Sequence, residues 1–275
     1  MHEHTPGSHS AIHSRRRRTR ADSQLPALPY LREVSLRTDA FLPLNEYPFR
    51  IPAVKNLQTL RFASDVTFLF GENGTGKSTL LEAIAVALGM NPEGGGRHFN
   101  FATRESHSPL WRALKLVRSW SRPRDQYFLR AESHFNVATE IERLDEDPEG
   151  GPPIIDAYGG ISRHEQSHGE SFFALIMHRF RGRGLYLLDE PEAALSPQRQ
   201  LQLLGRIRQL VHQDSQFIIC THSPILMAYP NARIFVLDQN GYTETAYTNT
   251  AHYRLYKNFL DNPEDGIRQA FAPHP

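Results

Sequence analysis

Four short, largely apolar runs stand out along the chain: Val66–Phe70, Leu185–Leu188, Gln216–Cys220 and Arg233–Leu237. Short runs that are apolar almost throughout are typical of strands buried on both faces, as in a parallel sheet. The pattern between these runs changes to helical spacing. The alternation of strands and helices predicts an α/β fold with a mostly parallel core sheet.

Two of the intervening helices carry clear end signals. Helix-forming residues fill Ser78–Leu88, and Gly89 suits the position after a helix end. Ser196 and Pro197 suit the N-cap and first position of a helix that continues to His212. Further helices are expected over residues 110–120, 170–180 and 250–260.

Weaker alternating patterns precede the first buried run. They predict strands at residues 30–36, 48–51 and 57–62, and therefore a small β-lobe before the core sheet. Another strand is expected at 126–131. Asn240-Gly241 predicts a hairpin turn, with the return strand at 242–247.

The first 27 residues differ in composition from the rest. They hold five arginines against Glu3 and Asp22, which is +3, so the remaining residues carry −2 of the total +1. Few apolar residues lie there, and we expect residues 1–27 to be a disordered tail. Its histidines could bind metal weakly and its arginines could touch nucleic acid, but composition alone defines no site. Residues 28–275 are expected to form a single domain, with a short helical insertion at about 104–170.

Several protein classes are disfavoured by the sequence. It has no run of eighteen apolar residues, so we expect no membrane helix, and its start lacks the apolar core of a secretory signal. Cys220 is the single cysteine, which excludes an internal disulfide and fits a reducing cytoplasm. Because Cys220 ends an apolar run, we expect it to be a small buried hydrophobe.

The segment that begins at Gly71 carries the strongest chemical signal. It has the form G-x-x-x-x-G-K-[ST] of a P-loop, between the strand Val66–Phe70 and the helix that follows. Loop amides and a helix N-terminus can bind phosphate, Lys77 can reach the β- and γ-phosphates, and the Ser78 hydroxyl can coordinate Mg²⁺. The expected nucleotide-binding residues are Gly71, Glu72, Asn73, Gly74, Thr75, Gly76, Lys77, Ser78 and Thr79.

Two carboxylates follow the buried run Leu185–Leu188, where ligands sit in α/β sheets. Asp189 is the expected second Mg²⁺ ligand, and Glu190 the expected general base for water. His222 follows another buried run and could hydrogen-bond the γ-phosphate and the water.

These motifs resemble those of ABC-type ATPases. Asp189-Glu190-Pro191-Glu192 with Ala193–Ser196 resembles the Walker B motif and D-loop, although Ser196 stands at the usual D-loop aspartate. Thr221-His222-Ser223 resembles the switch histidine. Gln166–Ser171 resembles the signature L-S-G-G-Q and keeps Ser167 and Gly169, which in this family meet the γ-phosphate bound to a second subunit.

Two family elements are harder to place. A Q-loop is expected after the strand at 126–131, where Glu132 and Asn136 are the polar candidates and no glutamine stands. Tyr47 or Phe49 could stack on adenine, and each could equally be a core residue. The overall pattern, over about residues 28–260, resembles small stand-alone bacterial ATPases related to ABC and SMC-type heads. It differs from SMC-type heads because no long coiled-coil segment lies between the P-loop and the signature.

The resemblance implies an ATPase that uses ATP and Mg²⁺, with Lys77, Glu190 and His222 as catalytic residues and Ser78 and Asp189 as metal ligands. It also implies a head-to-tail homodimer around two nucleotides, driving a protein or DNA partner. An alternative is the nucleotide-binding subunit of an ABC transporter. A third reading, a nucleotide-gated binding module with negligible turnover, is disfavoured by Glu190 and His222.

Overall fold

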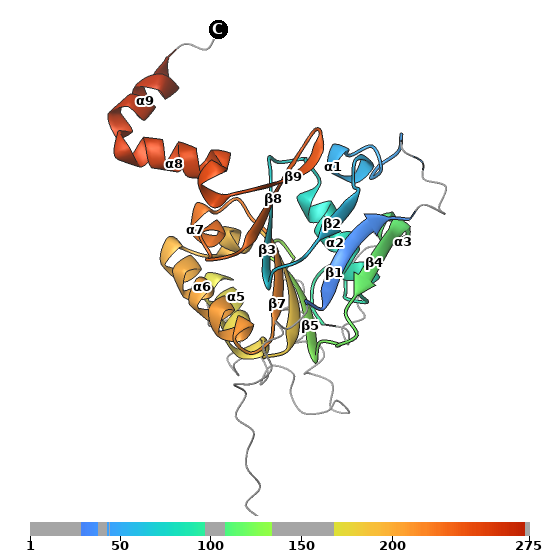
Figure 1. The fold of residues 1–275 in the computed structure, drawn as a ribbon. Coiled ribbons are helices and arrows are strands. Elements are labelled where there is room, and N and C mark those ends of the chain that lie inside the picture. The colour runs from blue at the N-terminus through green and yellow to red at the C-terminus, as the bar shows by residue number, and fades with distance from the viewer. Residues whose placement is uncertain (1–28, 38–42, 44, 97–107, 134–167, 273–275) are drawn as a thin grey trace, which may run out of the picture.

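A six-stranded core sheet organises the protein (Figure 1), as seen in a computed structural model that describes residues 29–37, 43, 45–96, 108–133 and 168–272. The strand order is β5-β6-β7-β3-β8-β9. All neighbouring pairs are parallel except β8 and β9, which form an antiparallel hairpin at one edge. The strands are β3 (Val66–Phe70), β5 (Asp125–Arg130), β6 (Gly184–Asp189), β7 (Gln216–Cys220), β8 (Arg233–Asp238) and β9 (Gly241–Thr245).

A second, antiparallel sheet stands beside the core. Its order is β2-β1-β4, and its strands are β1 (Leu31–Leu36), β2 (Thr59–Arg61) and β4 (Leu114–Arg118). The two sheets confirm the predicted α/β class with a mostly parallel core and an antiparallel β-lobe.

The helices lie on both faces of the core sheet and at its ends (Figure 1). The longer ones are α2 (Lys77–Ala87), α5 (His168–Arg179), α6 (Pro197–Val211), α8 (Ala251–Asp261) and α9 (Pro263–Phe271). The short ones are α1 (Pro52–Lys55), α3 (Leu110–Ala113), α7 (Pro224–Met227), η4 (Pro191–Ala194) and η5 (Tyr247–Asn249).

Strand β6 shows how the sheet is buried on two sides. Leu185 and Leu187 belong to a core cluster shared with α2 and the β-lobe, whereas Tyr186 and Leu188 belong to a second cluster shared with α5 and α6. Successive side chains point to opposite faces of a strand, so an unbroken apolar run satisfies both clusters. The apolar runs in the sequence are therefore explained by helices or strands that cover both faces.

Two local predictions are wrong. The helix expected over 110–120 ends at Ala113, and residues 114–118 form β4 instead, because their backbone pairs with β1. The strand expected at 48–51 is a turn that leads into α1. The proposed tail, residues 1–27, lies wholly outside the described residues. Most of the proposed helical insertion, at about residues 104–170, lies outside them as well. These domain boundaries therefore remain predictions.

The last two helices extend away from the sheets (Figure 1). Neither α8 nor α9 has a buried residue, and both expose apolar side chains, among them Leu255, Leu260 and Phe271. Among the described residues, no helix is long and apolar enough to cross a membrane. Helix α9 was not expected from the sequence.

Tyr186 of β6 connects its own strand to β5 and to the loop that follows α5. Its ring is fully buried and stacks on Phe180 at 4.2 Å between centroids. Its hydroxyl accepts a hydrogen bond from the Arg181 amide at 2.6 Å and lies 2.9 Å from Asp125 Oδ2. The ring fits because position 184 is glycine, where a Cβ would lie 2.3 Å from the ring.

We expect Tyr186→Phe to lower the free energy of unfolding by about 1–3 kcal/mol, because it leaves buried polar groups without their partner. Urea denaturation followed by circular dichroism measures this loss. Tyr256→Phe on the exposed face of α8 is the matched control and should change stability by less than about 0.5 kcal/mol. Equal stability of the two variants would contradict the assignment.

Candidate functional site

The P-loop runs from the end of β3 into α2, as its sequence context predicted. Gly74 and Gly76 have φ of +81° and +97°, a left-handed conformation that glycine adopts without steric cost. Gly76 is the N-cap residue of α2. The loop therefore turns sharply and presents the start of α2 to the pocket that lies over the P-loop.

Close packing fixes the loop from two sides. A Cβ at Gly71 would lie 2.3 Å from the Leu237 carbonyl oxygen, and one at Gly76 would lie 2.6 Å from the Ile51 side chain. The first contact comes from β8 and the second from the turn before α1. The glycines are therefore needed for close approach as well as for conformation.

Lys77 brings a buried positive charge into this loop. Its side chain is enclosed, and Nζ donates hydrogen bonds to the carbonyl oxygens of Gly71 at 2.8 Å and Glu72 at 3.1 Å. The Thr75 hydroxyl also donates to the Glu72 carbonyl, at 2.8 Å. The ammonium group is thus held within the loop by the loop's own backbone.

Ser78 and Asp189 are brought together although 111 positions separate them in the chain. The Ser78 hydroxyl donates to Asp189 Oδ1 at 2.9 Å. Ser78 lies in the first turn of α2, and Asp189 ends β6, at the carboxyl edge of the parallel strands. Two hard oxygen donors of the type that Mg²⁺ prefers therefore stand side by side.

Arg130 completes this cluster from β5. Its Nε donates to Asp189 Oδ2 at 3.0 Å, and its Nη1 donates to Glu82 Oε2 at 2.9 Å. Burial alone would lower the pKa of Arg130, but the carboxylates of Asp189 and Glu82 raise the pKa above its ordinary value. Both oxygens of Asp189 are thus satisfied, one by Ser78 and the other by Arg130.

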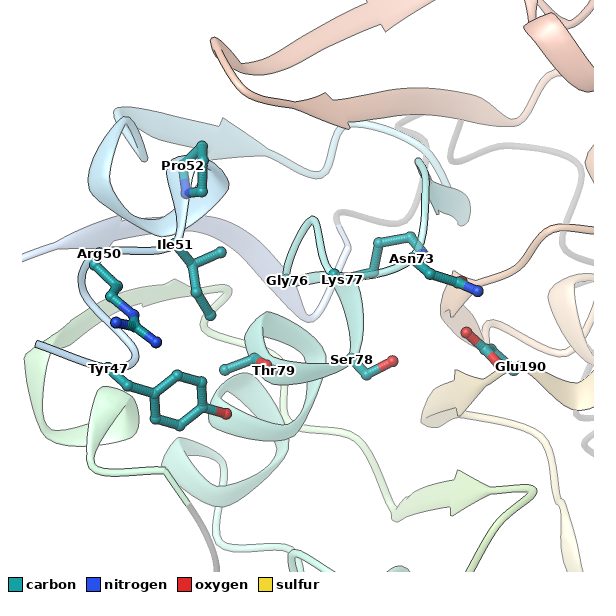
Figure 2. A pocket seen from close by; sticks show the side chains of 11 residues that line it. Tyr47, Arg50, Ile51, Pro52, Asn73, Gly76, Lys77, Ser78, Thr79 and Glu190 are labelled. Carbon is teal, nitrogen blue, oxygen red and sulfur yellow. The ribbon is translucent and has the colours of Figure 1, made fainter. Parts of the chain in front are cut away.

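Glu190 and His222 lie beside Ser78 and Asp189. Glu190 has φ of +49°, which is rare for a residue with a side chain, and its amide donates to the Cys220 carbonyl at 3.0 Å. The turn brings Glu190 Oε1 to 3.6 Å from His222 Nε2. Figure 2 shows the Glu190 carboxylate across the pocket from Tyr47, with Ser78 between them.

The surroundings of the His222 imidazole favour its neutral form. Its pKa is lowered by burial first, and then by the positive charge of Lys77 and by His252, while Glu72 opposes this. The ring lies 6.3 Å from the Phe70 ring and 5.7 Å from the His252 ring of α8. A neutral imidazole can donate one hydrogen bond and accept another.

The loop that carries His222 is tied to the segment after Glu190 by two hydrogen-bonded routes. The His222 amide donates to Glu192 Oε1 at 2.5 Å, and burial raises the pKa of Glu192. The Ser223 hydroxyl contacts Gln200 Oε1 at 2.6 Å, and Gln200 Nε2 donates to the Leu195 carbonyl at 3.0 Å. The segment 190–195 and the loop 221–223 are therefore connected by side chains.

A pocket of about 510 Å³ opens over the P-loop (Figure 2). Tyr47 and Arg50 form one wall, and Glu190 lies at the opposite side. Phe49 is buried in the core, so of the two aromatic candidates only Tyr47 lines the pocket. The described lining residues are Tyr47, Arg50, Ile51, Pro52, Asn73, Gly74, Gly76, Lys77, Ser78, Thr79 and Glu190.

The proposed signature lies elsewhere in the chain. Gly169 stands at the start of α5, where a Cβ would lie 2.7 Å from the Ala194 carbonyl oxygen. Gly169 is not among the described residues that line the pocket. Ser167 lies outside the described residues, as does the Q-loop candidate Asn136. Glu132 follows β5 in a turn and does not line the pocket either.

Comparison with known proteins agrees with this geometry. A family description named "AAA domain" matches residues 49–146, and one named "AAA ATPase domain" matches residues 166–227. An uncharacterized ABC transporter ATP-binding protein of Haemophilus influenzae is 26% identical over 209 residues, which are 68% of this chain and 74% of that protein. These similarities support an ABC-type P-loop ATPase.

Two further similarities are found. The cobalt import ATP-binding protein CbiO of Salmonella typhimurium is 28% identical over 204 residues, covering 68% of the ATPase and 73% of that protein. An SMC head domain from Thermotoga maritima superimposes with a TM-score of 0.41 and 14% identity, covering 78% of the ATPase and 98% of that chain.

Arg130 was missed by the sequence reasoning. A single charged residue at the end of an apolar strand is common. The only sequence signal for Arg130 was therefore its position at the end of such a strand. Its partner Asp189 has a side chain that is 5% exposed, and Glu82 one that is 13% exposed. The ATPase thus relies on one guanidinium group to neutralise two enclosed carboxylates.

We expect Arg130→Met, measured in EDTA, to lower the free energy of unfolding by about 3 kcal/mol, because losing one partner of a buried ion pair leaves uncompensated charge. Arg233→Met is the matched control. Its partner Glu244 is about half exposed, so the loss should stay near or below about 1 kcal/mol. Similar losses of unfolding free energy in the two variants would show that Arg130 does not stabilise the Asp189–Glu82 cluster.

Proposed function

We propose that the ATPase binds and hydrolyses ATP in the pocket over the P-loop, with the roles assigned from the sequence. The observation that carries this proposal is the 2.9 Å contact between Ser78 Oγ and Asp189 Oδ1, beside the loop that encloses Lys77. Lys77 and the loop amides would bind the phosphates. Of the other proposed nucleotide-binding residues, Asn73, Gly74, Gly76 and Thr79 line the described pocket, and Gly71, Glu72 and Thr75 form the loop behind Lys77.

The residues present fit Mg²⁺. Ser78 supplies a hydroxyl oxygen and Asp189 a carboxylate oxygen, and Mg²⁺ is usually held by one or two protein ligands plus substrate phosphates and water. Among the described residues, no cluster of three or more His, Cys, Asp or Glu forms a complete metal cage. When bound, the ion neutralises negative charge on the phosphates.

Glu190 and His222 are the groups proposed to act on water. Glu190 would take the proton from the attacking water as a general base. The neutral His222, 3.6 Å from Glu190, would orient the same water or the γ-phosphate through a hydrogen bond. The remaining work is positioning and charge neutralisation, which phosphoryl transfer chiefly requires.

Two variants separate binding from hydrolysis. Lys77→Ala should abolish tight ATP binding in calorimetry, because the cation facing the β- and γ-phosphates is lost. Glu190→Gln should keep ATP affinity while the hydrolysis rate falls by about 10²–10⁴-fold, the contribution of a general base. Lys257→Ala on exposed α8 serves as the charge control. Unchanged ATP affinity in Lys77→Ala would refute the site.

We further propose that ATP binding joins two copies head to tail. The resemblance assigns Ser167 and Gly169 to a signature that meets the γ-phosphate of a second copy. Support comes from Gly169 at the start of α5, a helix whose dipole favours an anion, and from its absence among the described residues of the pocket. Each motif would then complete its site only on the other copy.

Light scattering with ATP and Mg²⁺ tests this arrangement. Glu190→Gln should accumulate as a dimer, because hydrolysis no longer releases the subunits. The double variant Glu190→Gln/Ser167→Arg should remain a monomer that still binds ATP, since the added side chain would block the partner's phosphate. Ser167 is preferred to Gly169 for this change, because any Cβ at Gly169 collides with the Ala194 carbonyl in the same chain. A monomeric Glu190→Gln protein that binds ATP would rule out the sandwich.

The partner driven by this cycle is proposed to be a protein or DNA in the cytoplasm. A second candidate is the nucleotide-binding subunit of a transporter, and the observation favouring it is that curated relatives are described as transporter ATP-binding proteins. Against it, no glutamine follows β5, where transporter heads carry the loop that faces the membrane subunit. Co-purification of Glu190→Gln with an integral membrane protein would favour the transporter role.

A further inference from the structure

Five exposed arginines and one tryptophan gather where two loops meet. The first loop, 119–124, joins β4 to β5, and the second, 180–183, joins α5 to β6. The Arg124 amide donates to the Arg183 carbonyl at 2.8 Å, which holds the loops together. We call this surface the arginine–tryptophan patch; its residues are Arg118, Trp120, Arg122, Arg124, Arg181 and Arg183.

The patch lies away from the P-loop. The two loops lead into the first residues of β5 and β6, whereas Asp189 and the P-loop stand at the carboxyl ends of the parallel strands. The two sites therefore occupy opposite edges of the core sheet. A ligand on the patch would leave the ATP pocket accessible.

Trp120 is 89% exposed on a loop that is anchored at both ends. The Ser119 amide donates to the Tyr30 carbonyl at 3.0 Å, and the Ser119 hydroxyl donates to the Pro29 carbonyl at 3.1 Å. The other end is fixed by Arg124. An indole held outward on an anchored loop is unusual, because burying so large an apolar surface would otherwise stabilise the fold.

The positive charge of the patch is only partly offset. Asp214, Arg183 and Arg124 all lie within electrostatic reach of Tyr30, and Asp65 lies within reach of Asp214. Asp125 is occupied by Arg179 at 2.8 Å. Counted over the described residues, five arginines against these two carboxylates, Asp214 and Asp65, leave an excess of three positive charges, and the ion pairs found there include none of the five.

A hollow of about 210 Å³ lies within the patch. Apolar side chains of Tyr30, Leu88 and Leu185 line it, and Arg118, Trp120 and Arg122 stand around it. Such a site offers cations for phosphates together with an apolar surface and an aromatic face. An acidic protein surface would use the cations alone, and a duplex would keep its bases stacked away from the indole.

We propose that the arginine–tryptophan patch binds single-stranded nucleic acid, with the arginines on phosphates and Trp120 stacked on an unpaired base. This names the class of partner for the ATPase cycle and so rests on the proposed function. Binding by stacking and backbone contacts predicts little preference for base sequence and a strong dependence on salt.

The test is fluorescence anisotropy of the full chain with a labelled oligothymidylate, longer than the site of about 4–16 nucleotides that such proteins use. Trp120→Ala should weaken binding by about tenfold, within the range for losing one stacked base, and leave the salt dependence unchanged. Arg122→Gln should reduce the slope of log K against log salt by about 0.7, the value for one phosphate contact on a single strand. Phe271→Ala and Arg254→Gln, an exposed aromatic residue and an exposed arginine on α9 and α8, are the controls and should change neither.

Three results would overturn the proposal: no binding at low salt, a duplex of the same sequence bound as tightly, or binding that Trp120→Ala and Arg122→Gln leave unchanged. The last result would assign binding to another part of the chain, such as the arginines before residue 28. ATP hydrolysis without nucleic acid is measured in parallel and should be unchanged in both variants. A failure of the patch with normal hydrolysis is thus distinct from a failure of the proposed ATPase site.

Discussion

The enclosed carboxylate of Asp189 imposes the main constraint on this structure. A charge taken out of water is costly unless donors surround it, so α2 must bring Ser78 and β5 must bring Arg130 to within hydrogen-bonding distance. Arg130 in turn requires Glu82, one turn further along α2. Strands β5 and β6 and helix α2 are therefore held in register by a single charged cluster at the carboxyl edge of the sheet.

The sequence predicted much of this site because the residues concerned are bound to local patterns. A P-loop must follow a buried strand and open a helix, and Asp189 must end another buried strand. Both contexts are visible as apolar runs, so the class of fold and the meeting of Ser78 with Asp189 could be anticipated. Phe49 and Tyr47 were equal candidates beforehand, because only packing decides which of two nearby aromatic side chains enters the core.

Other features could not be anticipated, since they depend on contacts between distant segments. Residues 114–118 have apolar spacing that suits a helix, yet pairing with β1 makes them a strand. The importance of Arg130 arises from two carboxylates, 48 and 59 positions away. The arginine–tryptophan patch likewise exists only because two loops from separate parts of the chain are hydrogen-bonded together.

The thiol of Cys220 can report on opening of the core sheet. Cys220 is the single cysteine of the chain, it lies fully buried in β7 between β3 and β6, and burial raises the pKa of its thiol. Its carbonyl oxygen accepts a hydrogen bond from the Glu190 amide, so Cys220 lies next to the turn that carries Glu190. A thiol reagent can reach it only when the core sheet opens, and the rate of labelling therefore measures how often the native ATPase opens at the strands that carry its site.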